Sequence, residues 1–145
     1  MGYSVRLIKG EVIIPASKAE AALAAVHELD RRDDLKSGWT RDDDGVERRY
    51  WAFASLADVR AARTLSDVLK AFRFEPMLEP DGELYGVEFG GQNRGDEVHL
   101  WTALAPFVEP GGEMVWLSED EDDALTRWTF DGSSLAVSAG RMVFD

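Results

Sequence analysis

The stretch from Asp96 to Phe130 constrains the fold most, because it joins an apolar helix pattern to a hairpin pattern rich in tryptophan. Trp101 falls on the apolar stripe of the predicted helix, and Trp116 and Trp128 occupy inward positions of the predicted strands. Large aromatic side chains dominate the packing of protein cores. We therefore predict that all three tryptophans are buried between a helix and a C-terminal antiparallel sheet.

The remaining patterns complete an α+β arrangement, with helices interspersed early and consecutive strands at the end. Strands are expected over 3–14, 46–54, 74–80, 83–90, 114–117, 125–130, 135–138 and 141–144. Trp51 and Phe53 of the second strand are assigned to the core. The sequence predicts a single α+β domain over 1–145, with an antiparallel sheet, a C-terminal β-meander and two to three helices mostly on one face.

Helix starts are predicted from residues that cap the first turn of a helix. A Ser or Thr followed three residues later by an acid can satisfy the free amides there. Such pairs are Ser17 with Glu20, Ser55 with Asp58, and Thr64 with Asp67. A further helix is expected over 97–105, with Asp96 at its N-cap.

Charge is distributed unevenly along this chain, whose formal net charge is -12. Residues 1–73 hold thirteen basic side chains against twelve acidic ones, whereas residues 74–126 hold fourteen acids and one base, Arg94. A field of one sign repels nucleic acid and anionic lipid, so we expect neither direct nucleic-acid binding nor membrane binding. A solvated acidic face is the simplest interpretation.

A basic protein partner is the functional interpretation of the acidic segment 74–126, because complementary charge speeds association and fixes orientation. The sequence carries no signal for an oligomeric state. The candidate partner-binding residues are Glu109, Glu113, Glu119, Asp120, Glu121, Asp122 and Asp123.

Catalytic chemistry finds little support in the residue types present. The chain has no cysteine, which excludes disulfides and thiolate catalysis. The glycine-rich loop 90–95 has the outer spacing of a P-loop, but Asp96 and Glu97 stand where Lys and Ser or Thr are needed. Asp96 and His99 have helical spacing for two metal ligands, without a third in view. We predict a non-enzymatic protein with no cofactor and no metal.

No targeting signal is visible, and no apolar run approaches the roughly 20 residues of a membrane span. The longest early apolar run, over 12–14, is ended by Pro15. Together with the lack of cysteine, this indicates a cytoplasmic location.

Three C-terminal motifs resemble a small family of uncharacterised bacterial and phage proteins. They are LAPFVEPGG over 104–112, MVWL over 114–117 and RWTFDG over 127–132. The family pattern has the order W-R-x-x-F-x-x-G, whereas this chain has Arg127 before Trp128, and the turn 118–123 lacks the usual glycine. The resemblance covers the last third to half of the chain. It implies a bacterial or mobile-element setting and carries no activity.

Two functional hypotheses follow. The first is an acidic, non-enzymatic binding protein, such as a phage or mobile-element modulator or an antitoxin-like partner, that engages a basic protein through residues 74–126. A DNA-mimic inhibitor is a variant of this hypothesis. The second is a metal-dependent enzyme or metal-binding protein centred on Asp96 and His99.

Overall fold

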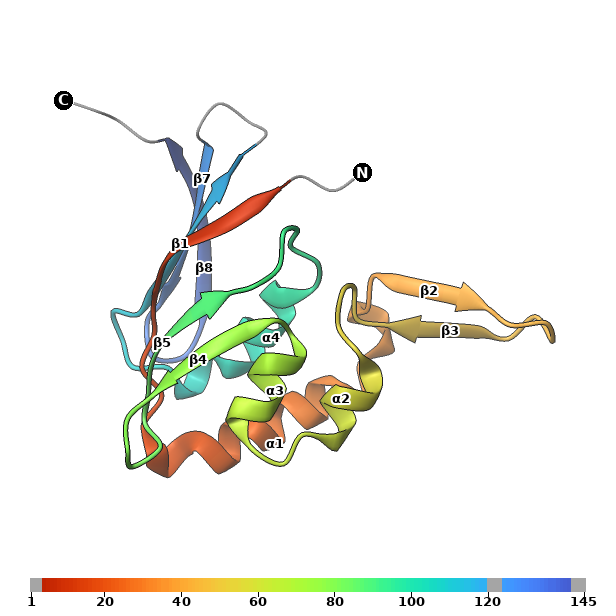
Figure 1. Ribbon diagram of the computed structural model, residues 1–145, viewed down its shortest axis with the longest axis horizontal. Helices are drawn as coiled ribbons and strands as arrows, with labels where there is room; N and C mark the ends of the chain where they lie inside the picture. Colours follow the sequence, from red (N-terminus) through yellow and green to blue (C-terminus); the bar gives the residue numbers. More distant parts are fainter. Residues whose placement is uncertain (1–3, 120–123, 142–145) are drawn as a thin grey trace.

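The computed structural model describes residues 4–119 and 124–141, and over these ranges the chain has an α+β fold (Figure 1). The largest sheet is antiparallel, with strand order β1-β6-β7-β8. Its strands are β1 (Val5–Glu11), β6 (Glu113–Ser118), β7 (Ala124–Phe130) and β8 (Leu135–Arg141). The last three form the predicted meander. β8 runs without a break through 139 and 140, where the sequence suggests a gap between two strands.

A second hairpin lies beside β1 and carries much of the acidic segment. Its strands are β4 (Phe74–Leu78) and β5 (Leu84–Phe89). The backbone amide of Val5 donates to the Gln92 carbonyl at 2.7 Å, which ties the chain after β5 to the start of β1. A Cβ atom at Gly10 would lie 2.2 Å from the Val87 carbonyl oxygen, so this crossing requires glycine.

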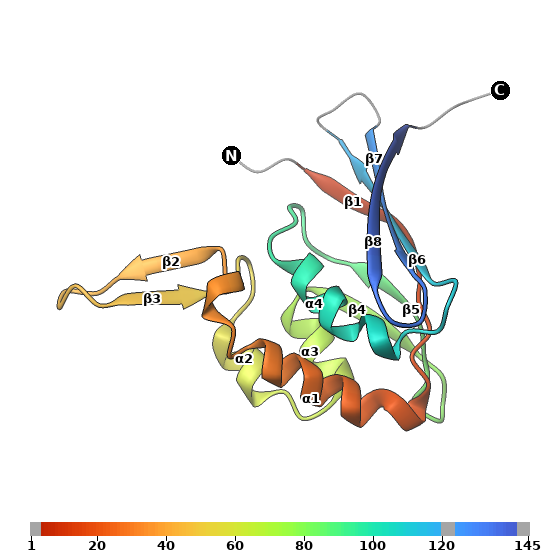
Figure 2. The ribbon, with the colours of Figure 1, turned by 180° about the vertical axis from the view of Figure 1, so that it is seen from behind.

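The helices pack mostly on one face of the sheet, as predicted (Figure 2). The α-helices are α1 (Ala19–Leu29), α2 (Leu56–Ala61), α3 (Leu65–Ala71) and α4 (Glu97–Leu104). Short 3₁₀ turns are η1 (Ala16–Lys18), η2 (Asp33–Leu35) and η3 (Ala105–Phe107). α1 contacts both α3 and α4, so one helical layer closes over the core.

Two of the three predicted capping pairs are confirmed. The Thr64 hydroxyl accepts from the Asp67 amide at 3.0 Å while the Asp67 carboxylate accepts from the Thr64 amide, and Ser55 caps α2. The prediction for Ser17 is wrong. This residue lies inside the 3₁₀ turn η1, and neither η1 nor α1 has a side-chain cap.

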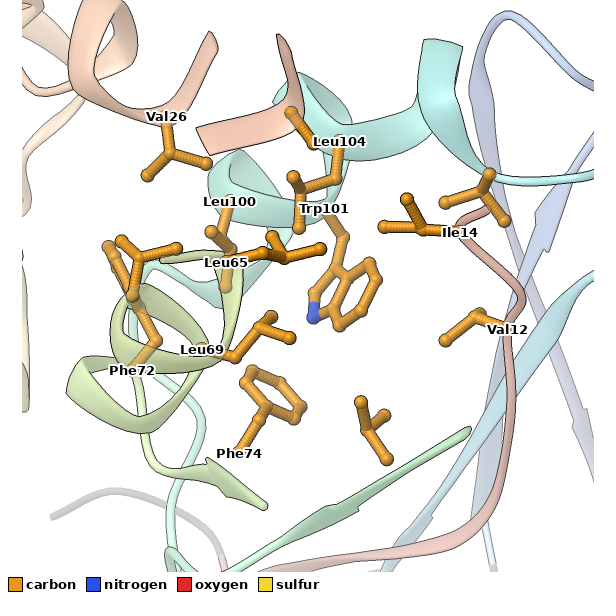
Figure 3. Packing of buried hydrophobic residues seen from close by; sticks show 14 of the residues in the cluster. Val12, Ile14, Val26, Leu65, Leu69, Phe72, Phe74, Leu100, Trp101 and Leu104 are labelled. Carbon is orange, nitrogen blue, oxygen red and sulfur yellow. The ribbon is translucent and has the colours of Figure 1, made fainter. Parts of the chain in front are cut away.

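Aromatic rings form the centre of the core, and Trp101 lies among side chains from several elements (Figure 3). The Trp101 ring meets Phe74 edge-on, with centroids 5.5 Å apart, and meets Phe130 at 6.0 Å. Trp116 and Trp128 lie 5.1 Å apart, centroid to centroid. Such tilted and edge-to-face pairs are the favoured arrangements of aromatic rings. The predicted burial of all three tryptophans is confirmed.

A two-stranded hairpin, which we call the arm (residues 38–50), projects away from this core (Figure 1). It consists of β2 (Gly38–Arg41) and β3 (Glu47–Tyr50). The strand predicted over 46–54 is therefore too long. Trp51 turns into the core as predicted, but Phe53 adopts a positive φ of 62° and is 55% exposed, so its predicted burial is wrong.

Candidate partner-binding surfaces

An acidic cleft of about 340 Å³ opens where the chain after β1 meets the turn into β6. We call it the Glu11–Glu109 cleft. The residues that line it and bear on its chemistry are Glu11, Ile13, Tyr85, Glu109, Gly111 and Gly112.

Backbone hydrogen bonds hold the two walls of this cleft together. The Glu109 amide donates to the Ile13 carbonyl at 2.8 Å, and the Gly111 amide donates to the Phe130 carbonyl at 2.9 Å. Gly111 has a φ of 93°, a conformation that glycine adopts at little steric cost. This turn places Glu109, a predicted partner-binding residue, beside Glu11, which the sequence analysis does not select.

The chemistry of the cleft suits a cationic side chain. Ile13 and Tyr85 are 41% and 45% exposed, and Glu11 and Glu109 are exposed as well. Over the described ranges, no hydrogen bond or ion pair engages the Glu109 carboxylate, while that of Glu11 lies 3.6 Å from Lys9 Nζ. A Lys or Arg can lay its aliphatic stem on apolar surface and direct its charge to a ring face or a carboxylate.

Glu113, a second predicted partner-binding residue, lies next to this cleft but is already neutralised. It stands directly opposite Glu11 in the β1–β6 pair. Its carboxylate contacts Lys9 Nζ and accepts a hydrogen bond from Arg127 Nε at 2.7 Å. The hydrogen bonds from Lys9 and then Arg127 lower the pKa of Glu113. Because its charge is compensated, Glu113 adds little negative charge to the cleft, and the acidic surface ends at this position of the sheet.

Glu119 lies at the other end of β6, about 20 Å from Glu113 for six residues of extended strand. Its carboxylate is 3.9 Å from Arg6 Nε, and its amide donates to the Ser4 carbonyl. The structure thus brings Glu109 and Glu113 together and leaves Glu119 apart. The predicted residues Asp120, Glu121, Asp122 and Asp123 lie outside the described residues.

The β4–β5 hairpin is a second place where negative charge is uncompensated. Glu75 stands directly opposite Glu88, and both side chains are exposed. Like charges at facing positions of an antiparallel pair destabilise the sheet. Glu88 is three residues from Tyr85 on β5, about 10 Å along the strand, and neither acid of this pair lines the cleft.

Asp96 and Glu97 belong to the acidic segment but are buried and structural. The Asp96 carboxylate accepts from the Ser37 amide at 3.0 Å and the Ala52 amide at 2.8 Å. Glu97 pairs with the Arg73 guanidinium. Asp96 stands at the predicted N-cap position, but its side chain makes no capping bond, because it ties both ends of the arm to the body.

The alternative metal hypothesis is centred on Asp96 and His99, whose surroundings the structure describes. Both Asp96 hydrogen bonds come from backbone amides, and the His99 ring lies 6.3 Å from the Trp51 ring. In residues 4–119 and 124–141, no three His, Asp or Glu side chains converge as metal ligands would.

The base of the arm is held by a buried charged cluster around Asp30. Trp51 Nε1 donates to Asp30 Oδ1 at 2.8 Å, and Arg60 Nε donates to Oδ2 at 3.1 Å. Lys36, whose side chain is 0% exposed, donates from Nζ to the Asp30 carbonyl at 2.6 Å and to Asp33 at 2.7 Å. An isolated two-stranded hairpin is marginally stable in water, so this cluster and Asp96 orient the arm.

Exposed aromatic side chains lie on both faces of the arm, and the sequence patterns do not predict them. Trp39 and Tyr50 are 55% and 40% exposed, and Tyr50 covers Gly38, whose Cβ would lie 2.3 Å from the tyrosine ring. The signal available in the sequence is a tryptophan inside a polar, turn-rich stretch. Tryptophan and tyrosine are enriched at contact surfaces between proteins.

No family model, no curated protein and no solved structure matches this chain. The resemblance of residues 104–132 to bacterial and phage proteins accordingly stays a prediction. Among the described residues, no helix combines the length and apolar character that crossing a membrane demands.

Proposed function

We propose that this protein is a non-enzymatic binding protein that engages a basic protein partner through the acidic surface of residues 74–126. The Glu11–Glu109 cleft is the observation that carries the proposal. It combines two exposed carboxylates with the exposed side chains of Ile13 and Tyr85. A role as a modulator in a phage or mobile element is the biological setting that the C-terminal resemblance favours.

Uncompensated charge supports a basic partner over a neutral one. The Glu109 carboxylate has no partner in the described part of the chain, and the facing Glu75 and Glu88 repel each other. A cationic segment would relieve this repulsion as it binds, and its apolar stems would cover Tyr85. Because the charges are exposed, we expect them to act mainly on the association rate.

The experiment is a capture from bacterial lysate at low salt, followed by association kinetics with the captured partner. The test variant is the double substitution Glu11→Gln and Glu109→Gln. The control, Glu20→Gln and Glu28→Gln, removes the same charge from exposed positions of α1. We expect the cleft variant to associate roughly tenfold more slowly at low salt, the control to change much less, and the difference to shrink at high salt. Equal rates for both variants would contradict the proposal.

The DNA-mimic alternative predicts a different competitor. A mimic occupies a nucleic-acid site on its partner, so duplex DNA would displace this protein from the captured partner in proportion to the affinity of the partner for DNA. Binding that persists with excess DNA, but is lost in the cleft variant, supports the protein-binding surface.

A further inference from the structure

Among the described residues, the Arg94 guanidinium has no hydrogen-bonding partner. It is the only basic residue of segment 74–126 and lies in the loop between β5 and α4. Its guanidinium lies over two core rings, 5.3 Å from the Trp116 centroid and 5.5 Å from the Trp128 centroid. Nowhere in the described ranges does a hydrogen bond or ion pair engage it. The nearby acid Glu97 is committed to Arg73.

A groove of about 380 Å³ opens beside this guanidinium. One wall is the start of α4, with Gly95 and Val98, and the other is the inner face of β7 and β8, with Thr126, Trp128 and Val137. Val137 is 58% exposed although it pairs with the buried Trp128 and so lies on the same face of the sheet. The Thr126 hydroxyl likewise has no hydrogen bond within residues 4–119 and 124–141.

This combination resembles a small-ligand site more than a packed surface. Ligand sites are concave and mostly apolar, with volumes of roughly 300–1,000 Å³ and a few polar groups that fix orientation. Partial burial lowers the pKa of Arg94, and the charge of Glu97 opposes this shift. A planar guanidinium presents paired N–H donors that match a carboxylate.

We propose that this groove binds a small monocarboxylate with an apolar body. The carboxylate accepts the paired donors of Arg94 and the Thr126 hydroxyl, while the apolar body lies between Val98 and Val137. A net charge of -12 disfavours a phosphate dianion more than a singly charged carboxylate. The volume matches a small molecule, and the site is independent of the Glu11–Glu109 cleft.

Tryptophan fluorescence provides the test, because Trp116 and Trp128 lie directly beneath the guanidinium. The probe is 3-phenylpropionate, compared with its neutral amide and with inorganic phosphate. We expect saturable binding of the acid, with the amide and phosphate each at least tenfold weaker. Equal binding of acid and amide, or tighter binding of phosphate, would overturn the proposal. A peptide ending in phenylalanine that bound more tightly than the free acid would overturn the small-molecule assignment.

Two variants separate the site from a structural role of Arg94. Arg94→Lys keeps the charge but loses the paired donors, and we expect it to weaken binding of the acid about tenfold. The control is Arg127→Lys, on the outer face of the sheet, which should leave binding of the acid unchanged. If Arg94→Lys does not fold, Thr126→Val replaces it and should weaken binding severalfold. The variant that folds, with a thermal midpoint near that of the wild type, is the one compared. If its affinity for the acid is unchanged, the proposed site is contradicted.

Discussion

Trp101 in the body and Trp51 at the base of the arm are both 0% exposed, yet their surroundings differ. Trp101 packs among apolar and aromatic side chains, and its Nε1 has no hydrogen-bond partner within the described residues. Trp51 donates to Asp30 and lies 5.3 Å from the Lys36 ammonium. Apolar packing tolerates small shifts, whereas hydrogen-bonded charges require one geometry. The body is therefore built for stability, and the base of the arm for orientation.

The largest effect on stability is expected in the body, where Trp101 packs among apolar side chains. Trp101→Ala should lower the free energy of unfolding by about 3–5 kcal/mol, because it opens a cavity that rings on several elements cannot close. Urea unfolding measures the change. A loss below about 1 kcal/mol would mean that the body does not depend on this ring.

Removal of the buried carboxylate beneath the arm should have a smaller and more local effect. Asp96→Ala leaves the Ser37 and Ala52 amides without their acceptor, so we expect a loss of about 2–3 kcal/mol. Amide hydrogen exchange should quicken at these two positions. Asp42→Ala is the matched control, because Asp42 also accepts two backbone amides but at the exposed tip of the arm. Equal losses of unfolding free energy in the two variants would mean that burial does not strengthen the contribution of the Asp96 hydrogen bonds.

Acid should weaken the base of the arm before it weakens the contacts of Trp101. Burial raises the pKa of Asp30, but hydrogen bonds from Trp51 and Arg60 and the charge of Lys36 outweigh it, so the net pKa lies below the ordinary 3.8. A lowered folded pKa means that this stabilisation is present above pH 3.8 and is lost as the pH falls through the folded value.

The measurement for this pH dependence is the stability difference between wild type and Asp30→Asn. It should be constant near neutral pH and shrink below pH 3.8. The difference between wild type and Trp101→Phe should not change over the same range. A parallel fall in both differences would remove the distinction between the two regions.

The smallest stability effect is expected from the run of acids that follows β6 in the sequence. Neutralising Glu119, Asp120, Glu121, Asp122 and Asp123 together should change the free energy of unfolding by less than about 1 kcal/mol, because a run of like charges is expected to be solvated and solvated charges contribute little. Association with a basic partner should nonetheless slow roughly tenfold at low salt. Thermal unfolding and association rates at two ionic strengths measure both. An unchanged association rate at low salt would mean that these acids are merely solvated and do not contribute to partner binding.

The body of the fold could be predicted because its signals are local. The stripe of α1, the caps at Ser55 and Thr64, and the alternation around Trp116 each depend on residues a few positions apart. The error at Phe53 has a physical cause. Strand alternation assigns it to the core with Trp51, but the positive φ of Phe53 turns the chain away after β3.

The candidate site could be predicted only in part. Composition selects Glu109 as part of an acidic segment, but Glu11 reaches it only through the pairing of β1 with β6 and the turn at Gly111. The burial of Asp96 depends on amides 59 and 44 residues away along the chain. Contacts of this kind come from tertiary approach, which spacing in one sequence does not encode.

The central claim is that the Glu11–Glu109 cleft receives a basic segment, and NMR titration tests it most directly. A short Lys- and Arg-containing peptide is added to the 15N-labelled protein, with an acidic peptide of the same length as control. We expect shifts of the Gly111, Gly112 and Tyr85 amides that saturate, that weaken with salt and that disappear in the Glu11→Gln and Glu109→Gln variant. Shifts confined to the arm, or unchanged in that variant, would contradict this claim.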